Sequence, residues 1–378
     1  MVSLLETHRR LYNSALAQRK NCYEAEQKTV TYGEQSARLK IARKADDSLD
    51  LANFSSCQRT LKRLDRAFQA FFRRVKSGGT AVKGNLCARK VGYPRFRGFG
   101  RFDSIDFTIG DGAKLTKEGK ARFQNVGDVK LKLHRAVEGT IKTATFQRHA
   151  GKWYVAFVCE VEKEITETST NPAIGIDLGL KSFLVTSEGE AVDAPKLYRK
   201  AQAKLRRSQR AVARKKRGGA NRRKAVKTLA KIHAHVANQR KDFHHKTAKS
   251  LVDRYGVIAH EDLNVRGMVR SLNLAKSTHD AGWSQFLNIL KQKAECAAVS
   301  VVSVNPRNTT QACSRCGCLP ATPIGLSVRV YVCEHCQFSL DRDWNAAINI
   351  LEKYTAGTLP LQANVDGCIM RSARSLPL

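Results

Sequence analysis

The chain of 378 residues carries 67 Lys and Arg against 33 Asp and Glu, which gives a formal net charge of +34. An excess of this size excludes an ordinary enzyme of small metabolites and predicts a polyanionic partner. Hydrophobic residues make up 42% of the chain, enough to bury sizeable cores. Because no apolar run reaches the roughly 18 residues of a membrane span and the N-terminus lacks a secretory signal, we expect a cytoplasmic protein with no membrane partner.

The first 80 residues predict a helical lobe. Apolar side chains recur at helical spacing from Leu61 to Val75, with Arg and Lys between them. The Ser-Gly-Gly sequence at 77–79 predicts the end of this helix. A similar pattern from Leu4 to Leu16 predicts a second helix of the same bundle.

A β-rich region is predicted from residue 81 to 170. It begins with GYPRFRGFGRF at 92–102, where arginines alternate with aromatic rings. Rings stack on bases and arginines bind phosphates, so Arg95, Arg97 and Arg101 are candidate nucleic-acid contacts. A loop supported by a small core would have the same composition. Alternating segments at 129–134, 140–148 and 151–162 then predict strands, the last two joined as a hairpin.

The remainder alternates between strands and helices, an order that indicates an α/β domain. Strands are predicted for AIGIDLGL, SFLVTSEGE, YGVIAHEDL and SVVSV, with a long basic helical segment after the second and a helix at 283–298 after the third. The Gly-Gly pair at 218–219 predicts a break in the basic segment. The tail from 357 to 378 lacks periodicity and is expected to be disordered.

Fourteen Lys or Arg and no Asp or Glu occur between Lys196 and Lys224. Like charges at helical spacing repel unless something neutralises them, and a phosphate backbone does so. A solubilising face is the alternative. The candidate contacts in this segment are Arg206, Arg207, Arg210, Arg214, Lys215, Lys216 and Arg217.

Two Cys-x2-Cys pairs, Cys313 with Cys316 and Cys333 with Cys336, have the spacing of a structural zinc site. A redox couple would need only one pair. Cys318 is the single candidate for a substituted ligand. The other cysteines are scattered, which indicates a reducing compartment.

Three carboxylates flank apolar elements. Asp177 and Glu261 end two predicted strands, and Asp343 begins a helical segment. A lone acid at such a place is commonly a cap or an ion-pair partner. Three acids in a strongly basic chain instead suggest a divalent-cation site, because their mutual repulsion would otherwise raise their pKa values.

These motifs resemble those of one known family. GIDLGLKSF, HEDLNVRGM, QACSRCG with CEHC, and DRDWNAAINI, in this order, closely resemble TnpB, the transposon-encoded RNA-guided nucleases related to type V CRISPR effectors. RFRGFGRFDSIDF and KDFHHKTAKSLV also look like family segments. The resemblance covers roughly residues 8–357, and the combination is far more specific than any single motif.

The resemblance implies a multidomain α+β fold built around an RNase H-like (RuvC) α/β nuclease domain with an inserted zinc ribbon. The expected domains are a helical recognition lobe at 1–80, a β-barrel wedge at 81–170, the RuvC domain at 171–305 and 339–356, and the ribbon at 306–338. Family members commonly begin with an extra strand, which this chain is expected to lack. Trp344 is bulkier than the residue expected beside the acid.

The resemblance also implies a function. Asp177, Glu261 and Asp343, the last preferred over Asp341, would hold two catalytic Mg²⁺ ions, and one Zn²⁺ would be structural. The partners would be a transposon-derived guide RNA and target double-stranded DNA, in a nucleoid-associated prokaryotic protein of monomeric or dimeric state. A guided DNA-binding regulator without cleavage and a transposase or its accessory DNA-binding protein remain as alternatives.

Overall fold

The computed structural model describes residues 1–76, 92–116, 118–162, 171–270, 274–325 and 327–358. The chain divides into two compact units, Met1–Lys163 and Glu164–Leu378. The predicted helix end at 77–79 lies outside the described residues. None of the described helices contains an apolar stretch of the length that crossing a bilayer requires.

Four helices begin the first unit. The two predicted helices are confirmed, and two shorter ones lie between them. Their bounds are α1 Val2–Glu26, α2 Tyr32–Ala45, α3 Asp47–Asp50 and α4 Phe54–Lys76. α2 begins with a capping box, in which the Glu34 backbone N–H donates to Thr31 Oγ1 and the Thr31 backbone N–H donates to the Glu34 carboxylate.

A six-stranded sheet completes the first unit. Its order is β4-β3-β2-β1-β5-β6, and its strands are β1 Ser104–Ile109, β2 Gly112–Leu115, β3 Lys120–Phe123, β4 Gly127–Lys130, β5 Thr140–His149 and β6 Lys152–Glu160. The predicted β5–β6 hairpin is confirmed. Among the described residues β4 and β6 are the edges of this sheet, so the barrel expected from the resemblance is here an open half-barrel.

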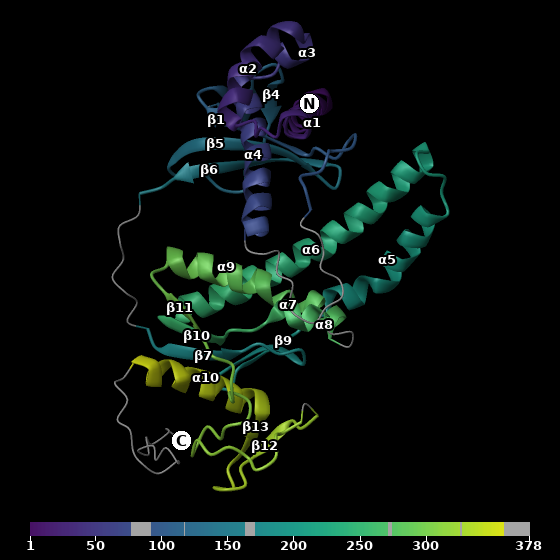
Figure 1. Ribbon diagram of the computed structural model, residues 1–378. Coiled ribbons are helices and arrows are strands. Elements are labelled where there is room, and N and C mark those ends of the chain that lie inside the picture. The colour runs from purple at the N-terminus through teal and green to yellow at the C-terminus, as the bar shows by residue number, and fades with distance from the viewer. Residues whose placement is uncertain (77–91, 117, 163–170, 271–273, 326, 359–378) are drawn as a thin grey trace. The chain divides into compact units, whose positions relative to one another are not determined.

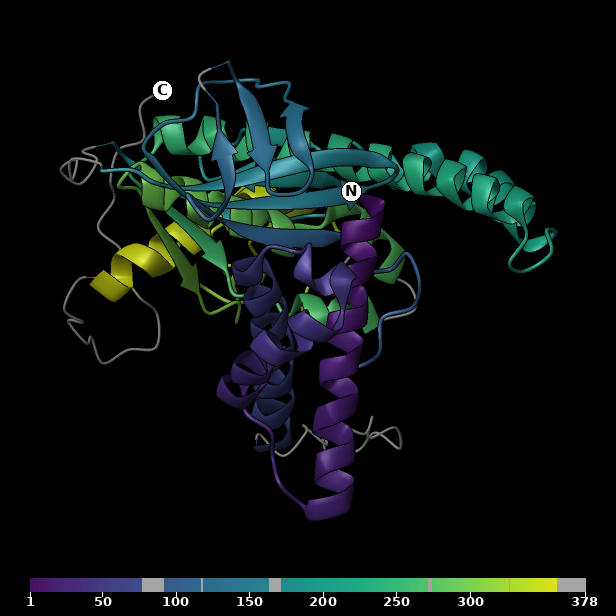
Figure 2. The same ribbon diagram turned by 90° about the horizontal axis from the view of Figure 1, so that it is seen from above.

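The helices lie against one face of this sheet (Figures 1 and 2). Leu61, Leu64 and Phe68 of α4 belong to the same hydrophobic core as Ile105 and Phe107 of β1. The helical and β-rich parts of this unit therefore share one core.

The second unit is built on a five-stranded sheet of order β11-β10-β7-β8-β9. The strands are β7 Ala173–Asp177, β8 Ser182–Thr186, β9 Ala191–Asp193, β10 Val257–Glu261 and β11 Ser300–Val304. The helices are α5 Leu197–Ala213, α6 Ala220–Arg254, α7 Val265–Arg270, α8 Ala275–Ala281, α9 Trp283–Cys296 and α10 Arg342–Thr358. Two short strands, β12 Val330–Val332 and β13 Ser339–Asp341, precede α10.

The predicted strands and the helix break at 218–219 are confirmed in this unit. α10 extends through Thr358, two residues into the predicted tail. Its last buried side chain is Ile350, about two turns before the end of the helix. The rest of the tail lies outside the described residues. α6 and α9 cover one face of the sheet and α10 covers the other (Figure 1).

The contact between α10 and β7 leaves no room for a side chain at Gly175. A Cβ there would overlap the backbone oxygen of Ala347 and lie 2.7 Å from the backbone nitrogen of Leu351. We expect Gly175→Ala to lower the free energy of unfolding by about 1–3 kcal/mol, measured by urea denaturation. Gly357→Ala is the control, since a Cβ at Gly357 meets only open space in the same helix. Equal effects of the two substitutions would contradict this close packing.

Candidate active site and metal centre

Asp177 and Glu261 are neighbours at one edge of the second sheet. β7 and β10 are parallel, and Ile176 lies opposite His260, so the next residue of each strand is an acid. Because the carboxyl ends of parallel strands meet at one edge, both acids project from that edge. Side chains alternate along a strand, which places Asp177 on the same face as Gly175, the face that α10 covers.

Asp343 reaches this edge from the first turn of α10. Its Oδ2 lies 4.0 Å from where a Cβ of Gly179 would stand, in the loop directly after Asp177. Asp341 has another role, since its Oδ1 accepts from the backbone N–H groups of Asp343 (2.9 Å) and Trp344 (3.2 Å) and so caps α10. The structure therefore brings Asp343, rather than Asp341, toward the other two acids.

Burial and charge act together on these carboxyls. Burial raises the pKa of Asp177 to about 8, and repulsion from Glu261 and Asp343 adds to the effect. Arg342 and the Leu178 N–H oppose the rise without cancelling it. Burial also raises the pKa of Glu261. A cluster that resists ionisation in this way is stabilised by added positive charge.

Glu261 has neighbours that the sequence did not identify. The hydroxyl of Thr309 donates to its carboxylate, and the ammonium of Lys353 opposes the rise of its pKa. Lys353 also donates to the backbone oxygens of Asn305 (3.1 Å) and Arg307. Thr309 lies in a loop and Lys353 lies in α10, both far from Glu261 in the sequence. The sequence therefore contains no signal for either contact beyond the position of Glu261 at the end of a strand.

Trp344 anchors α10 beside the acid. Its Nε1 donates to the backbone oxygen of Ser187 at 2.9 Å, and its ring lies over the turn between β8 and β9. A Cβ on Gly189 in that turn would come within 2.9 Å of the ring. The large side chain of Trp344 therefore fits because residue 189 is a glycine.

The four predicted cysteines converge. Their Sγ atoms all lie within 4.8 Å of one another, with 3.7 Å from Cys313 to Cys336 and 3.6 Å from Cys316 to Cys333. Four sulfurs about 2.3 Å from one tetrahedral ion would lie about 3.8 Å apart, so the donor set fits zinc. Among the residues described, this is the only group of three or more potential ligands that converges so closely, and Cys318 is not part of it.

The two cysteine pairs form matching turns. In each, the residue after the second cysteine has a positive φ, Gly317 at 76° and Gln337 at 58°, and its N–H donates to the oxygen of the first cysteine. Burial alone would raise the pKa of Cys316, but the Cys318 N–H and the neighbouring thiols lower it to about 6.

The cysteine turns are tied to α10 by two asparagines. Asn345 accepts from the Ser314 N–H (2.9 Å) and donates to the Ala312 oxygen (2.8 Å). Asn349 donates to the oxygens of Ala312 (2.7 Å) and Thr309 (2.8 Å). The segment that leads into the cysteines thereby contacts both the helix of Asp343 and, through Thr309, Glu261.

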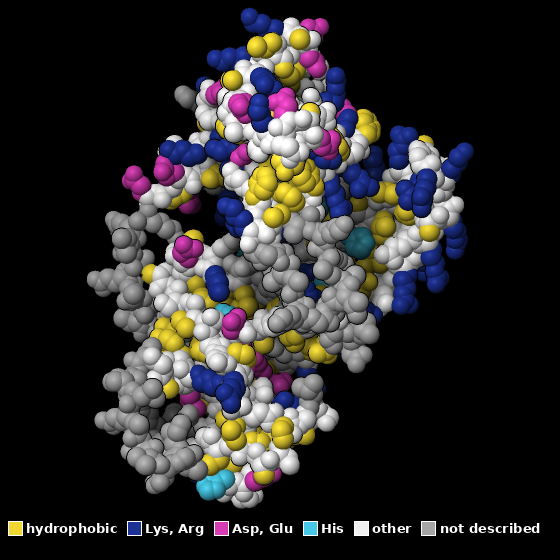
Figure 3. All heavy atoms as spheres, viewed as in Figure 1, with side chains coloured by type: hydrophobic (Ala, Val, Ile, Leu, Met, Phe, Trp, Pro, Cys, Tyr) yellow, Lys and Arg dark blue, Asp and Glu magenta, His cyan; other side chains and the backbone are white. Residues whose placement is uncertain are grey.

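The predicted basic contacts lie on two surfaces, one in each unit. Arg206, Arg207, Arg210, Arg214, Lys215, Lys216 and Arg217 are all exposed on α5 and the turn after it. Figure 3 shows Lys and Arg side chains gathered over the α5–α6 hairpin.

In the first unit, Arg95, Arg97 and Arg101 are exposed in the loop before β1. This loop has features of both a nucleic-acid surface and a loop supported by a small core. Tyr93 packs edge-on against Phe68 and Phe71 of α4, whereas Phe96 and Phe99 are 52% and 81% exposed.

Residues 156–272 match the OrfB_IS605 family, described as "Probable transposase", and residues 283–350 match the family described as "Cas12f1-like, TNB domain". A protein of Streptomyces pristinaespiralis named "Putative RNA-guided DNA endonuclease" is 32% identical over 91% of this chain and 82% of its own length. "Putative RNA-guided DNA endonuclease InsQ" of Escherichia coli K12 is 28% identical over 90% and 85%. "CRISPR-associated endodeoxyribonuclease Cas12f1" of Sulfoacidibacillus thermotolerans is 22% identical over 79% and 76%.

Proposed function

Because the chain belongs to the TnpB-like family of insertion-sequence-encoded RNA-guided DNA endonucleases, we propose that Asp177, Glu261 and Asp343 form its DNA-cleaving site. The observation that carries this proposal is the convergence of the three acids at one edge of the second sheet. The pKa of Asp177, near 8 and raised in part by the other two acids, reflects that convergence. We further propose that the second unit is a RuvC-like nuclease domain and that residues 306–338 form its zinc ribbon.

The acids have the chemistry of a magnesium site. Mg²⁺ prefers carboxylate oxygens, and its charge would offset the burial and the repulsion that together raise the pKa of Asp177. When bound, two such ions supply an activated water and stabilise the leaving 3′-oxygen of the cleaved strand. The chain's own contribution is to hold the three carboxylates in place, with Thr309 orienting Glu261 and Trp344 fixing the start of α10.

The positive charge of the exposed surfaces supports nucleic acids as the partners. The exposed arginines and lysines on α5 and in the loop before β1 provide the positive surfaces that a guide RNA and its DNA target require. Contacts of this kind position a nucleic acid, and base pairing by the guide would specify the sequence. Residues 1–80 and 81–170 would then serve as the recognition lobe and the wedge.

A single experiment tests the function. The protein is expressed together with the flanking DNA of its own locus, the copurified RNA is sequenced, and a matching DNA target with randomised flanks is offered with and without Mg²⁺. We expect cleavage that requires both the RNA and Mg²⁺. Guided binding without cleavage would indicate a regulator, and strand transfer would indicate a transposase, so either result would contradict the proposal.

A further inference from the structure

A row of three side chains on α10 holds the loop that follows β11. Asn345, Asn349 and Lys353 are spaced four residues apart, so they lie along one face of the helix. Each of them donates to backbone oxygens of residues 305–312. The two asparagines hold the later part of this loop, next to the cysteines. Lys353 alone in the row holds its beginning, directly after β11.

Thr309 lies inside this loop and connects it to the site of the acids. The residue is 1% exposed, and its hydroxyl donates to the Glu261 carboxylate. Asn349 donates to the Thr309 backbone oxygen at 2.8 Å and so holds the loop on one side of the contact. On the other side Lys353 donates to the backbone oxygen of Arg307, two residues earlier. Both holds are needed to keep the hydroxyl where Glu261 meets it.

Lys353 can act on Glu261 in two ways, by charge and by position. Burial lowers the pKa of Lys353 and Glu261 opposes this, while the Lys353 ammonium opposes the rise in the pKa of Glu261. The two effects have opposite consequences for a metal ion. A nearby positive charge repels Mg²⁺, whereas a carboxylate that is held in place by a hydrogen bond binds it better.

We propose that Lys353 is a positioning residue of the DNA-cleaving site, which holds the beginning of the loop so that Thr309 keeps the Glu261 carboxylate in its metal-binding orientation. The hydrogen bonds of the ammonium support position over charge, because they are made to the loop. The inference rests on the proposed function, because that function makes Glu261 a metal ligand.

The test measures the Mg²⁺ concentration that gives half of the maximal rise in Tm of the full chain without nucleic acid. Lys353→Met removes the ammonium but keeps the length of the side chain, and we expect it to raise this concentration about tenfold, as loss of a group behind a metal ligand does. Thr309→Val removes the hydroxyl but keeps the shape, and it should have the same effect. Thr309→Ser keeps the hydroxyl and should need no more Mg²⁺ than the wild type.

The double variant of Lys353→Met and Thr309→Val separates position from charge. If Lys353 acts through Thr309, the two effects are not independent, and the double variant again needs about tenfold more Mg²⁺. A rise of about a hundredfold, the product of the single effects, would overturn the proposal. An unchanged or lower requirement in Lys353→Met would also overturn it, since loss of positive charge alone favours the binding of a cation.

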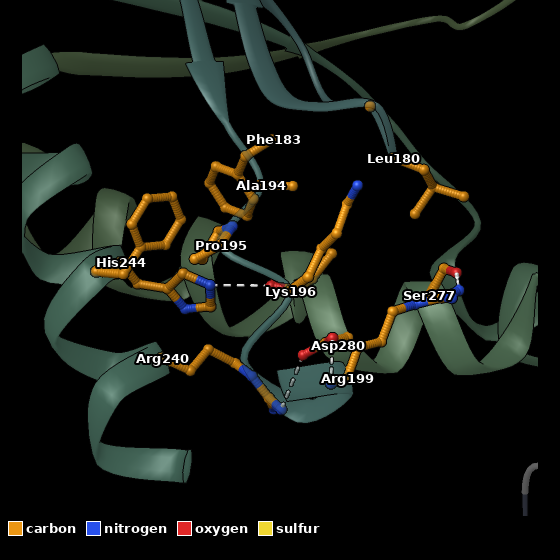
Figure 4. Close-up of a pocket in the computed structure, with 13 residues that line it drawn as sticks. Leu180, Phe183, Ala194, Pro195, Lys196, Arg199, Arg240, His244, Ser277 and Asp280 are labelled. Carbon is orange, nitrogen blue, oxygen red and sulfur yellow. Dashed lines mark hydrogen bonds and ion pairs between the residues drawn. The ribbon is translucent and has the colours of Figure 1, made fainter. Parts of the chain in front are cut away.

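Lys196→Met is the matched control for the loss of a lysine charge. Lys196 lines a cavity of about 230 Å³ together with Gly179 and Leu180, in the loop that follows Asp177 (Figure 4). The lining of this cavity includes none of residues 305–312. The substitution should therefore leave the required Mg²⁺ concentration unchanged. A rise equal to that of Lys353→Met would assign the effect to lost charge and contradict the proposal.

A conservative variant and a kinetic measurement separate positioning from general damage to the fold. Lys353→Arg keeps the charge and the donors, so it should need less Mg²⁺ than Lys353→Met. In cleavage assays Lys353→Met should lower kcat at limiting Mg²⁺ and leave the KM for target DNA unchanged, with recovery in excess Mg²⁺; a raised KM without this recovery would contradict the proposal. If Mg²⁺ fails to raise the Tm of the wild type, the proposed metal site is wrong. If the wild type and Lys353→Met respond at the same concentration, only the role of Lys353 is wrong.

Discussion

Asp177→Asn is expected to abolish DNA cleavage and, at the same time, to stabilise the metal-free protein. The substitution preserves the shape of the side chain but removes a charged metal ligand, so we expect cleavage to fall at least about 10²–10³-fold. Guided binding of DNA should change little, since it depends on the basic surfaces. Cleavage and gel-shift assays with the same RNA and target separate the two effects.

The gain in stability follows from the pKa of Asp177, about 8 when folded and near 3.9 when unfolded. The folded protein holds the proton more tightly, so protonation contributes stability that is complete below pH 4 and is lost as the pH rises through 8. Once ionised, the buried carboxylate destabilises the fold by about 5–6 kcal/mol. In Mg²⁺-free buffer, the Tm of Asp177→Asn should therefore exceed that of the wild type by an amount that grows between pH 5 and 9.

Asp193→Asn provides the control in the same sheet. Asp193 is exposed on β9, so its substitution should alter neither cleavage nor the dependence of Tm on pH. Addition of Mg²⁺ should raise the Tm of the wild type and of this control but not that of Asp177→Asn, because only the first two retain the site. A variant that loses cleavage without becoming more stable at high pH would show that burial and the neighbouring acids do not raise the pKa of Asp177.

Strands β7, β8 and β10 could be predicted because each contains a short apolar run that the fold buries on both faces. The acids follow from the same pattern, since Asp177 and Glu261 stand where such runs end. The cysteine turns are local and need no tertiary information. Each of these features is contained within a few consecutive residues.

Other features depend on contacts between distant segments. α2 and the short strands β2 and β3 have weak patterns of their own and are stabilised by the core that they share with α4. The contact of Thr309 with Glu261 and those of Lys353 with the loop before Thr309 exist only once separate elements have packed together. The open edge between β4 and β6 likewise depends on strand pairing, which composition does not reveal.

Zinc loss should impair cleavage through the connection between the cysteine turns and the acids. Cys333→Ser removes one of four ligands, and structural zinc contributes much of the folding free energy of such small modules. We expect the purified variant to lose its equivalent of zinc and to become sensitive to proteolysis within residues 306–338. The order of the preceding segment, in which Thr309 and Ala312 bind Glu261 and Asn349, should be lost with it.

Cys318→Ser is the control for this experiment, because Cys318 follows the first pair closely in sequence but lies outside the cluster of four sulfurs. It should retain zinc and cleavage, while Cys333→Ser loses both and keeps the first unit resistant to protease. Glu261 and Asp343, which this segment and α10 contact, are more than 80 residues apart in the sequence. We therefore expect the cysteine turns to affect cleavage by holding both acids toward Asp177. If Cys333→Ser lost zinc but cut DNA at the normal rate, the asparagine contacts would be sufficient to position the acids without the metal.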